Sequence, residues 1–217
     1  MTRLKLIYYL DVLSSWCFVV EPALARLRQT LGQRLEYDWR IAYLFGGGSM
    51  GYSAELSAWQ YRRNHSVSGA TLNPAWRESL DDTTWFADLA AEAARSLGIT
   101  DDSVRLALTN AAFVDGRHVG RRDEAVRVAV EASRLSPAAI ERAMDDTAVI
   151  ERMQATTAEY RALGVQVQPA FVMSNEIGDT AILSGLFRYE TIAACADEML
   201  AAADQYAAFE RAHPQPA

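Results

Sequence analysis

Cysteine and histidine are scarce in this sequence, which has two of the first and three of the second among its 217 residues. Cys17 and Cys195 lie far apart and in different predicted helices, so we do not expect a structural disulfide between them. His65, His118 and His213 are scattered, without the spacing that zinc ligands show. The sequence therefore predicts neither a disulfide framework nor a metal site.

Long apolar runs and an excess of positive charge are also missing. No run approaches the roughly 20 residues of a membrane span, and no signal-peptide core follows the first few residues. The net charge is −7 and the pI is about 5.0, which argues against nucleic acid or an anionic membrane surface as a partner. We expect a cytoplasmic protein whose partner is a small molecule, such as an aromatic one.

The composition is that of an ordinary globular protein, with 50% hydrophobic and 23% charged residues. Apolar residues alternate with others over 3–10 and over 35–44, which predicts two strands. Between them, apolar residues at helical spacing predict a helix over 18–31, which Gly32 ends. A right-handed crossover would make the two strands parallel.

The middle and the end of the chain follow different patterns. Residues from 54 to about 160 are expected to be helical nearly throughout, with capping residues between successive helices. Short strands at 169–174 and 180–184 are so close that they predict an antiparallel hairpin, and a long helix follows over 189–211. The predicted fold class is therefore α/β: a thioredoxin-like fold (β-α-β … β-β-α) interrupted by an all-helical insert subdomain.

The expected domains follow from this order of elements. Residues 1–50 and 164–212 form the thioredoxin-like domain, and residues 51–163 form the inserted helical subdomain. Residues 213–217 form a frayed tail.

The stretch 10–18 joins the first strand to the first helix within a few residues. A helix start presents unpaired backbone N–H groups and a partial positive charge, so it can bind an anion or stabilise a thiolate. The polar side chains there are Ser14, Ser15 and Cys17, with Trp16 among them. Simpler roles are open for two of these residues, since Ser14 could be only a helix N-cap and Cys17 only a small packed hydrophobic residue.

Two further loops are candidates for the same site. Pro169 stands directly before a strand, which predicts a fixed turn with a cis peptide bond after Gln168. The backbone of Gln168 would then point into the cleft beside Ser14. The glycine-rich loop 45–51, which contains Gly47, follows a parallel strand at the end where α/β sheets bind ligands. It lacks the lysine of a phosphate-binding P-loop, and the simpler interpretation is a turn that allows a close approach of the backbone.

Taken with the predicted fold, these residues resemble the DsbA-like thioredoxin family, which includes the FrnE-type proteins, the kappa-class glutathione transferases and the 2-hydroxychromene-2-carboxylate isomerases. The resemblance covers nearly the whole chain. Six stretches carry it: Asp11-Val-Leu-Ser-Ser-Trp-Cys17, Leu44-Phe-Gly-Gly-Gly48, Ser68-Gly-Ala70, Thr84-Trp-Phe-Ala87, Ala112-Phe-Val114 and Gly164-Val-Gln-Val-Gln-Pro-Ala-Phe-Val172. The first and last together indicate the superfamily but not a substrate.

The branches of this family differ at the turn before the first helix. Redox members carry Cys-X-X-Cys, whereas here Ser14 stands at the first cysteine position and Cys17 at the second. A two-cysteine redox cycle is not available, because serine cannot form a mixed disulfide. Kappa-like members have a serine that matches Ser14, and the resemblance implies that its hydroxyl donates to the thiolate of glutathione, the expected cofactor. The resemblance also implies a homodimer.

Two departures from the kappa-like pattern concern the glutathione site. Kappa-like proteins open their last helix with a Ser-Asp pair, where this sequence has Gly185-Leu-Phe-Arg-Tyr189. Their lysine in the insert is also not evident, and Arg62, Arg63 or His65 could take its place. The candidate ligand-binding residues are Ser15, Trp16, Gly47, Arg62, His65, Gln168 and Pro169.

Three functional hypotheses remain open. The first is a kappa-like, glutathione- or thiol-dependent isomerase or transferase in which Ser14 stabilises a thiolate. The second is a thiol oxidoreductase-like protein with single-thiol chemistry at Cys17. The third is a non-thiol metabolite-binding protein or a cofactor-free isomerase. Ser14 and Cys17 are thus the candidate catalytic residues.

Overall fold

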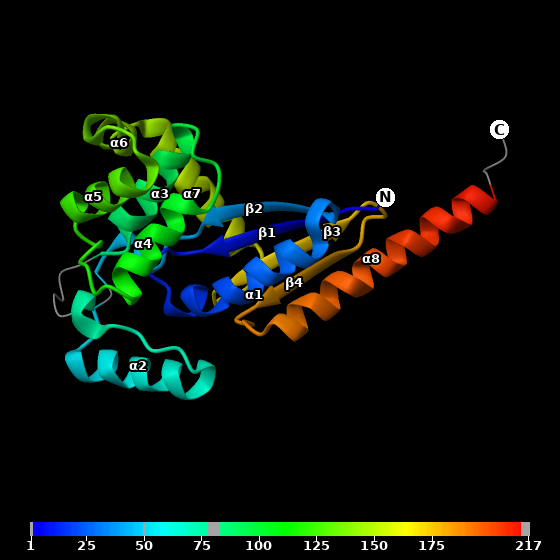
Figure 1. Ribbon diagram of the computed structural model, residues 1–217, viewed down its shortest axis with the longest axis horizontal. Helices are drawn as coiled ribbons and strands as arrows, with labels where there is room; N and C mark the ends of the chain where they lie inside the picture. The colour runs from blue at the N-terminus through cyan, green and yellow to red at the C-terminus, as the bar shows by residue number, and fades with distance from the viewer. Residues whose placement is uncertain (1, 50, 78–82, 214–217) are drawn as a thin grey trace. The chain divides into compact units, whose positions relative to one another are not determined.

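The computed structural model describes residues 2–49, 51–77 and 83–213 (Figure 1). The chain divides into two compact units. Unit 1 comprises Met1–Tyr9, Val20–Arg40 and Val165–Ala217, and unit 2 comprises Leu10–Val19 and Ile41–Gly164. The expected domain boundaries, which follow the order of thioredoxin-like elements, stay a prediction.

A four-stranded sheet with the order β2-β1-β3-β4 is the centre of unit 1. The arrows of β1 and β2 point the same way in Figure 1, and β3 pairs antiparallel with both β1 and β4. The predicted β-α-β unit and the C-terminal hairpin are therefore confirmed. The strands are β1 Leu4–Leu10, β2 Leu35–Ile41, β3 Ala170–Asn175 and β4 Thr180–Ser184.

The alternation of residues in β1 explains its place in the sheet. Leu4, Leu6 and Tyr8 are fully buried, whereas Lys5 is exposed. The ring of Tyr8 stacks on Phe171 of β3, with 5.1 Å between the centroids. Burying each large side chain stabilises the fold by about 1.5–3 kcal/mol, so a register shift that exposed this face is strongly disfavoured.

Two helices pack on the sheet of unit 1. These are α1 (Ser15–Leu31), from Val20 onward, and α8 (Tyr189–Ala212). The guanidinium of Arg26 on α1 lies 3.7 Å from the centroid of the Tyr189 ring on α8, so the two helices are neighbours. In Figure 1 the C-terminal part of α8 extends past the ends of the strands.

Helices make up most of unit 2. Helix α3 contacts α4, α5, α6 and α7, and five of its eight buried residues are alanines, which let neighbouring helices approach closely. Among the described residues no helix is both long and apolar enough to cross a membrane. The α-helices are α2 Ala54–Ser68, α3 Trp85–Ser96, α4 Ser103–Phe113, α5 Arg122–Ser133, α6 Pro137–Met144 and α7 Thr147–Ala162.

The first helix begins earlier than its apolar spacing predicts. It starts at Ser15 rather than Phe18, because the carbonyl of Ser14 already accepts the N–H of Phe18 at 3.0 Å. The polar residues at the start carry no apolar periodicity, so the sequence pattern missed this turn. Cys17 therefore belongs to the first turn of α1.

The second strand ends three residues earlier than predicted, at Ile41 instead of Leu44. The amide of Ala42 still bonds to the carbonyl of Leu10 in β1 at 2.7 Å, but the following amides do not, since Tyr43 N–H donates to Thr157 Oγ1 at 3.2 Å. Leu44 N–H donates to a carboxylate at 2.8 Å. The alternation of apolar residues continues past the strand, and it cannot detect a change of hydrogen-bonding partner.

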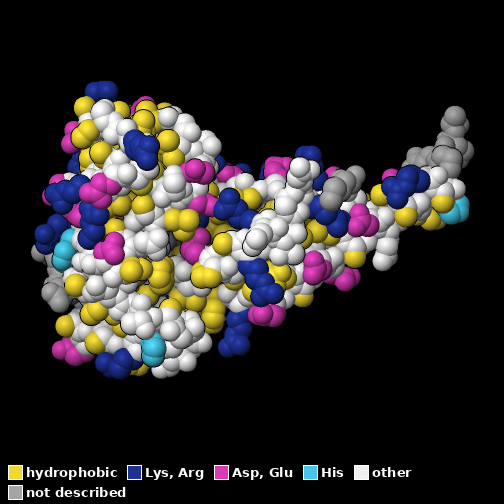
Figure 2. All heavy atoms as spheres, in the orientation of Figure 1, with side chains coloured by type: hydrophobic (Ala, Val, Ile, Leu, Met, Phe, Trp, Pro, Cys, Tyr) yellow, Lys and Arg dark blue, Asp and Glu magenta, His cyan; other side chains and the backbone are white. Residues whose placement is uncertain are grey.

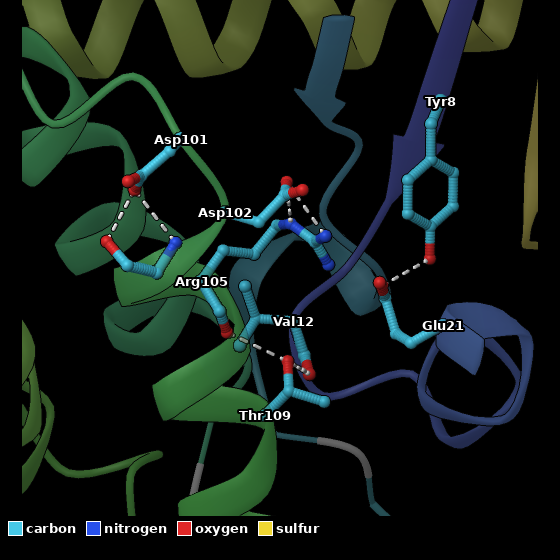
Figure 3. Close-up of polar contacts among 8 residues, drawn as sticks. Tyr8, Val12, Glu21, Asp101, Asp102, Arg105 and Thr109 are labelled. Carbon is cyan, nitrogen blue, oxygen red and sulfur yellow. Dashed lines mark hydrogen bonds and ion pairs between the residues drawn. The ribbon is translucent and has the colours of Figure 1, made fainter. Parts of the chain in front are cut away.

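A buried ion pair holds the start of α4. Nη2 of Arg105, a residue only 1% exposed, donates to Asp102 Oδ1 at 3.0 Å, and its Nε donates to the same oxygen at 3.3 Å (Figure 3). Removing one partner of such a pair takes a compensating contact away from the other, buried charge.

We expect Asp102→Ala to lower the free energy of unfolding by about 3–5 kcal/mol for this reason. The matched control is Asp145→Ala, whose carboxylate pairs with Arg122 at 2.7 Å on the surface and whose loss should cost about 1 kcal/mol or less. Urea unfolding of both variants measures the difference. Equal effects would mean that the Arg105 charge has another compensating partner.

Candidate functional site

The turn between β1 and α1 is defined by its hydrogen bonds. Val12 N–H donates to Asp88 Oδ1 at 2.8 Å. Leu13 N–H donates to Asp11 Oδ1 at 2.8 Å, and Ser14 N–H donates to the carbonyl of Asp11 at 3.0 Å. Buried N–H groups are almost always paired, so this network sets the conformation that places Ser14.

The opposite side of the turn is held by α4. Thr109 Oγ1 lies 3.2 Å from the carbonyl oxygen of Val12 and 3.0 Å from that of Arg105 (Figure 3). The turn is thus tied to both α3 and α4 of unit 2.

Ser14 is the N-cap of α1 and is 7% exposed. Its Oγ accepts the N–H of Cys17 at 3.4 Å. A serine hydroxyl has one hydrogen to donate and two acceptor positions, so this bond leaves the hydroxyl hydrogen available. The capping role and a role toward a thiolate are therefore compatible.

Cys17 is 2% exposed, as expected for a small packed hydrophobic residue. Its neighbour Tyr160 has a raised pKa, first because of burial and then because of the charge that a Cys17 thiolate would add. In unit 1, Cys195 on α8 is half-buried, and burial raises its pKa too. Ser15 and Trp16, the first two residues of α1, are half-buried.

A cation and two indole rings gather beside the turn. The guanidinium of Arg63 lies 5.4 Å from the ring centroid of Trp16 and 5.1 Å from that of Trp59. Trp59 is 49% exposed, and Figure 2 shows hydrophobic side chains at the surface where α2 runs. Contacts of this kind contribute about 0.5–1 kcal/mol at exposed sites. A cationic group thus lies against Trp16, which follows Ser14 by two residues in the first turn of α1.

The structure separates Arg63 from the other basic residues of α2. Successive residues point about 100° apart on a helix of 3.6 residues per turn, so Arg62 does not share the face of Arg63. His65 Nδ1 lies 3.4 Å from the hydroxyl of Thr71 instead. The ligand-binding role of Arg62 and His65 stays a prediction, and Arg63 is the residue of this set that lies against Trp16.

The glycine-rich loop packs closely on an aromatic ring. Gly47 has a φ of +78°, and a Cβ there would lie 2.6 Å from Cε3 of Trp85. Leu44, at the start of the loop, donates its N–H to Asp11 Oδ2. This geometry agrees with the simpler interpretation, a close approach of the backbone, and a ligand contact of Gly47 stays a prediction.

The second predicted loop belongs to unit 1. The peptide bond between Gln168 and Pro169 is cis, and both residues are buried. The carbonyl of Pro169 accepts the N–H of Gly185 at 2.8 Å, which joins the start of β3 to the end of β4. The convergence of this loop with the Ser14 turn stays a prediction.

Sequence reasoning missed a group of buried carboxyl groups behind the turn. Asp11, Asp88 and Glu92 are each at most 1% exposed. Burial raises the pKa of Asp11 and raises that of Asp88 well above its ordinary value, with the charge of Asp11 as the second cause. The signal was present in α3, where Asp88 and Glu92 stand four residues apart among alanines, on the face that the helix buries.

These features together define a protein of the thioredoxin-like fold class. Its Ser14 stands where redox members carry the first cysteine of Cys-X-X-Cys. A family model of the DSBA-like thioredoxin domain matches residues 5–195. The chain belongs to this family, and the predicted family and fold class are confirmed.

Solved structures agree in fold at low sequence identity. The cytosolic disulfide reductase DsbM from Pseudomonas aeruginosa with GSH has 16% identity and a TM-score of 0.72, over 90% of this chain and 98% of that one. A 2-hydroxychromene-2-carboxylate isomerase has 16% identity and a TM-score of 0.64, over 94% and 98%. Pseudomonas aeruginosa DsbA has 14% identity and a TM-score of 0.59, over 95% and 86%. No curated protein matches the sequence.

The loop beside the turn can be tested by a pair of glycine variants. Gly47→Ala places a methyl group against Trp85 at a positive φ, and we expect it to destabilise the fold by about 2–3 kcal/mol. Gly46→Ala is the matched control, since its φ is +64° and no atom lies within 4 Å of the added Cβ; about 1 kcal/mol is expected. Thermal unfolding measures both, and equal losses would contradict the close packing on Trp85.

Proposed function

We propose that this protein is a kappa-like, glutathione- or thiol-dependent isomerase or transferase in which Ser14 stabilises a thiolate. The observation that carries the proposal is the place of Ser14, at the start of α1, with its Oγ accepting from Cys17 N–H. The remaining hydroxyl hydrogen can donate to a sulfur anion. The helix N-terminus adds a partial positive charge at the same point.

The geometry around Cys17 favours this function over single-thiol redox chemistry. A thiol that exchanges with disulfides must be accessible and form a thiolate, whereas Cys17 is 2% exposed. Ser14 cannot form a mixed disulfide. Ser14 and Cys17 stand where redox members carry their two cysteines. The geometry thus supports a capping and thiolate-binding role for Ser14 and a packing role for Cys17.

The residues present suit part of a glutathione molecule. Glutathione, when bound, would supply the thiolate nucleophile. Arg63, over the Trp16 ring, offers a cation for a carboxylate, and the exposed indole of Trp59 offers a flat apolar surface for an aromatic substrate. The start of α8 has Arg188 as its N-cap and lacks the Ser-Asp pair of kappa-like proteins, so another small thiol remains within the proposal.

Two relatives support the same class of chemistry. One is a disulfide reductase whose structure was solved with GSH, and the other is a 2-hydroxychromene-2-carboxylate isomerase. The proposal includes a small-molecule substrate, a cytoplasmic location like that named for DsbM, and a homodimer. It includes no nucleic acid or membrane partner, in keeping with the net charge of −7.

Binding of glutathione tests the role of Ser14. We expect millimolar glutathione to raise the melting temperature of the wild type, and Ser14→Ala to abolish this rise because the thiolate loses its hydrogen-bond donor. The matched control is Ser136→Ala, which removes another serine N-cap, at the start of α6, whose Oγ accepts from Ala139 N–H at 3.2 Å. Both variants lose a cap worth about 1 kcal/mol, but only Ser136→Ala should keep the glutathione response. An unchanged response in Ser14→Ala rejects the role of Ser14, and no response in the wild type rejects glutathione as the thiol.

A second binding experiment distinguishes the contributions of the basic residues of α2 to glutathione binding. Arg63→Gln should weaken glutathione binding about tenfold, because a tenfold change corresponds to about 1.4 kcal/mol, the scale of one exposed charged contact. Arg62→Gln and His65→Gln test the other two candidates for this role, and each should leave the dissociation constant within about twofold of the wild type if Arg63 binds the carboxylate. Isothermal titration measures all three. A larger effect at Arg62 or His65 would assign the carboxylate to that residue instead.

A further inference from the structure

Two carboxyl groups that the proposed function does not use meet in the interior of unit 2. Asp11, directly after β1, and Asp88, in the first turn of α3, are fully buried, and they accept the N–H groups of two successive residues, Leu13 and Val12, at 2.8 Å each. An ionised carboxylate can only accept hydrogen bonds, so a bond between two carboxyl groups requires a proton on one of them. Asp88 Oδ2 is buried and finds no hydrogen-bond donor group among the described residues, which makes it the place for that proton.

The other contacts of the pair also assign the proton to Asp88. Asp11 accepts the N–H groups of Leu13 and Leu44, each at 2.8 Å, and such bonds favour the ionised form. Asp88 accepts a single backbone N–H. The raised pKa of Asp88, caused by burial and then by the charge of Asp11, has the same direction.

Among the described residues, the charged groups on the surrounding elements are paired with partners other than Asp88. Glu92, one turn along α3, adds negative charge, and it pairs with Arg152 Nε of α7 at 3.3 Å. Asp102 and Arg105 of α4 pair with each other, and Tyr160 is the titratable residue that α7 buries. The buried residues of α5 and α6 are all apolar. A bound proton is therefore the means of neutralising the pair.

We propose that Asp88 is a positioning residue whose protonated carboxyl group, hydrogen-bonded to Asp11, holds the turn that presents Ser14. Asp88 binds Val12 N–H and Asp11 binds Leu13 N–H, so the pair holds both residues that lead into Ser14. At high pH the proton passes to water, and two carboxylates then repel each other in the protein interior. Separation of the pair breaks the bond to Val12 and loosens the turn. The effect on ligand binding rests on the proposed function, whereas the shared proton does not.

Amide hydrogen exchange of the full chain tests the shared proton without a ligand. The protection of Val12 N–H, corrected for the intrinsic exchange rate, is followed from about pH 5 to about pH 9. We expect it to fall about tenfold or more relative to Ala42, whose N–H donates to the carbonyl of Leu10 at 2.7 Å in the same unit. Parallel protection of the two amides over the whole range overturns the proposal.

The variant Asp88→Asn imitates the protonated form, because an amide can accept from Val12 and donate to Asp11. The folded state of the wild type binds an extra proton, so its stability falls as the pH rises from the ordinary carboxyl pKa through the raised one. We expect this fall in melting temperature, and the fall in Val12 protection, to disappear in Asp88→Asn. Their persistence overturns the proposal, and if the variant does not fold, the wild-type comparison of Val12 with Ala42 decides.

The matched control is Glu92→Gln, which removes a buried carboxyl group of the same helix, one turn from Asp88. It should keep the fall in Val12 protection but move it to lower pH values, where the wild type is still protected. Removing a negative charge near Asp88 could only lower the pKa of that residue. Loss of the fall in Glu92→Gln, with its persistence in Asp88→Asn, would place the proton on Glu92 and overturn the role of Asp88.

Glutathione binding then tests the positioning role. Glutathione itself titrates over this pH range, and its titration affects both proteins equally. We therefore compare the ratio of the dissociation constant of the wild type to that of Asp88→Asn, from which this effect cancels. We expect this ratio to rise about tenfold over the same pH range. A constant ratio with measurable binding rejects the positioning role of Asp88. Absence of binding in both proteins rejects glutathione as the ligand of the proposed function, and the exchange experiment still decides the shared proton.

Discussion

Backbone N–H groups in the protein interior need oxygen acceptors, and this constraint is most severe at the turn between β1 and α1. Neither a strand nor a helix supplies partners there. Asp88 binds Val12 N–H, while Asp11 binds Leu13 and Leu44. Two carboxyl groups thus join the turn, the glycine-rich loop and α3 within unit 2. The fold accepts the cost of burying these acids because unpaired amides in the same place would also be costly.

The same turn explains how a scaffold shared with thiol oxidoreductases can take another chemistry. The N–H groups and partial positive charge of a helix start can stabilise a sulfur anion. Exchanging the first cysteine for Ser14 leaves that environment in place and removes the covalent step. What remains is a donor, a helix terminus and, on α2, Arg63 beside Trp16 and Trp59. The proposed function assigns these groups to the recognition of a small thiol rather than to electron transfer.

Much of the site was predictable, and the parts that were missed have a common reason. Residue type and position along the chain predicted three features. These are the serine at the first cysteine position, the loop at Pro169 and, as one of two alternatives, the burial of Cys17. The choice of Arg63 over Arg62 depends on how α2 is rotated, which its weak apolar pattern does not reveal. The Asp11–Asp88 pair joins residues 77 positions apart, and a contact of that kind leaves no periodic trace in the sequence.

The sequence by itself determined the family, the order of strands and helices, and the loss of the dithiol pair. These properties depend on residue type and on spacing along the chain, which apolar periodicity and capping residues report directly. Tertiary structure alone decided that Leu44 leaves the strand to reach Asp11, that Gly47 packs on Trp85, and that Asp88 is buried against another acid. Each of these depends on hydrogen-bond and packing partners brought together from distant parts of the chain, where burial changes the preferred protonation state.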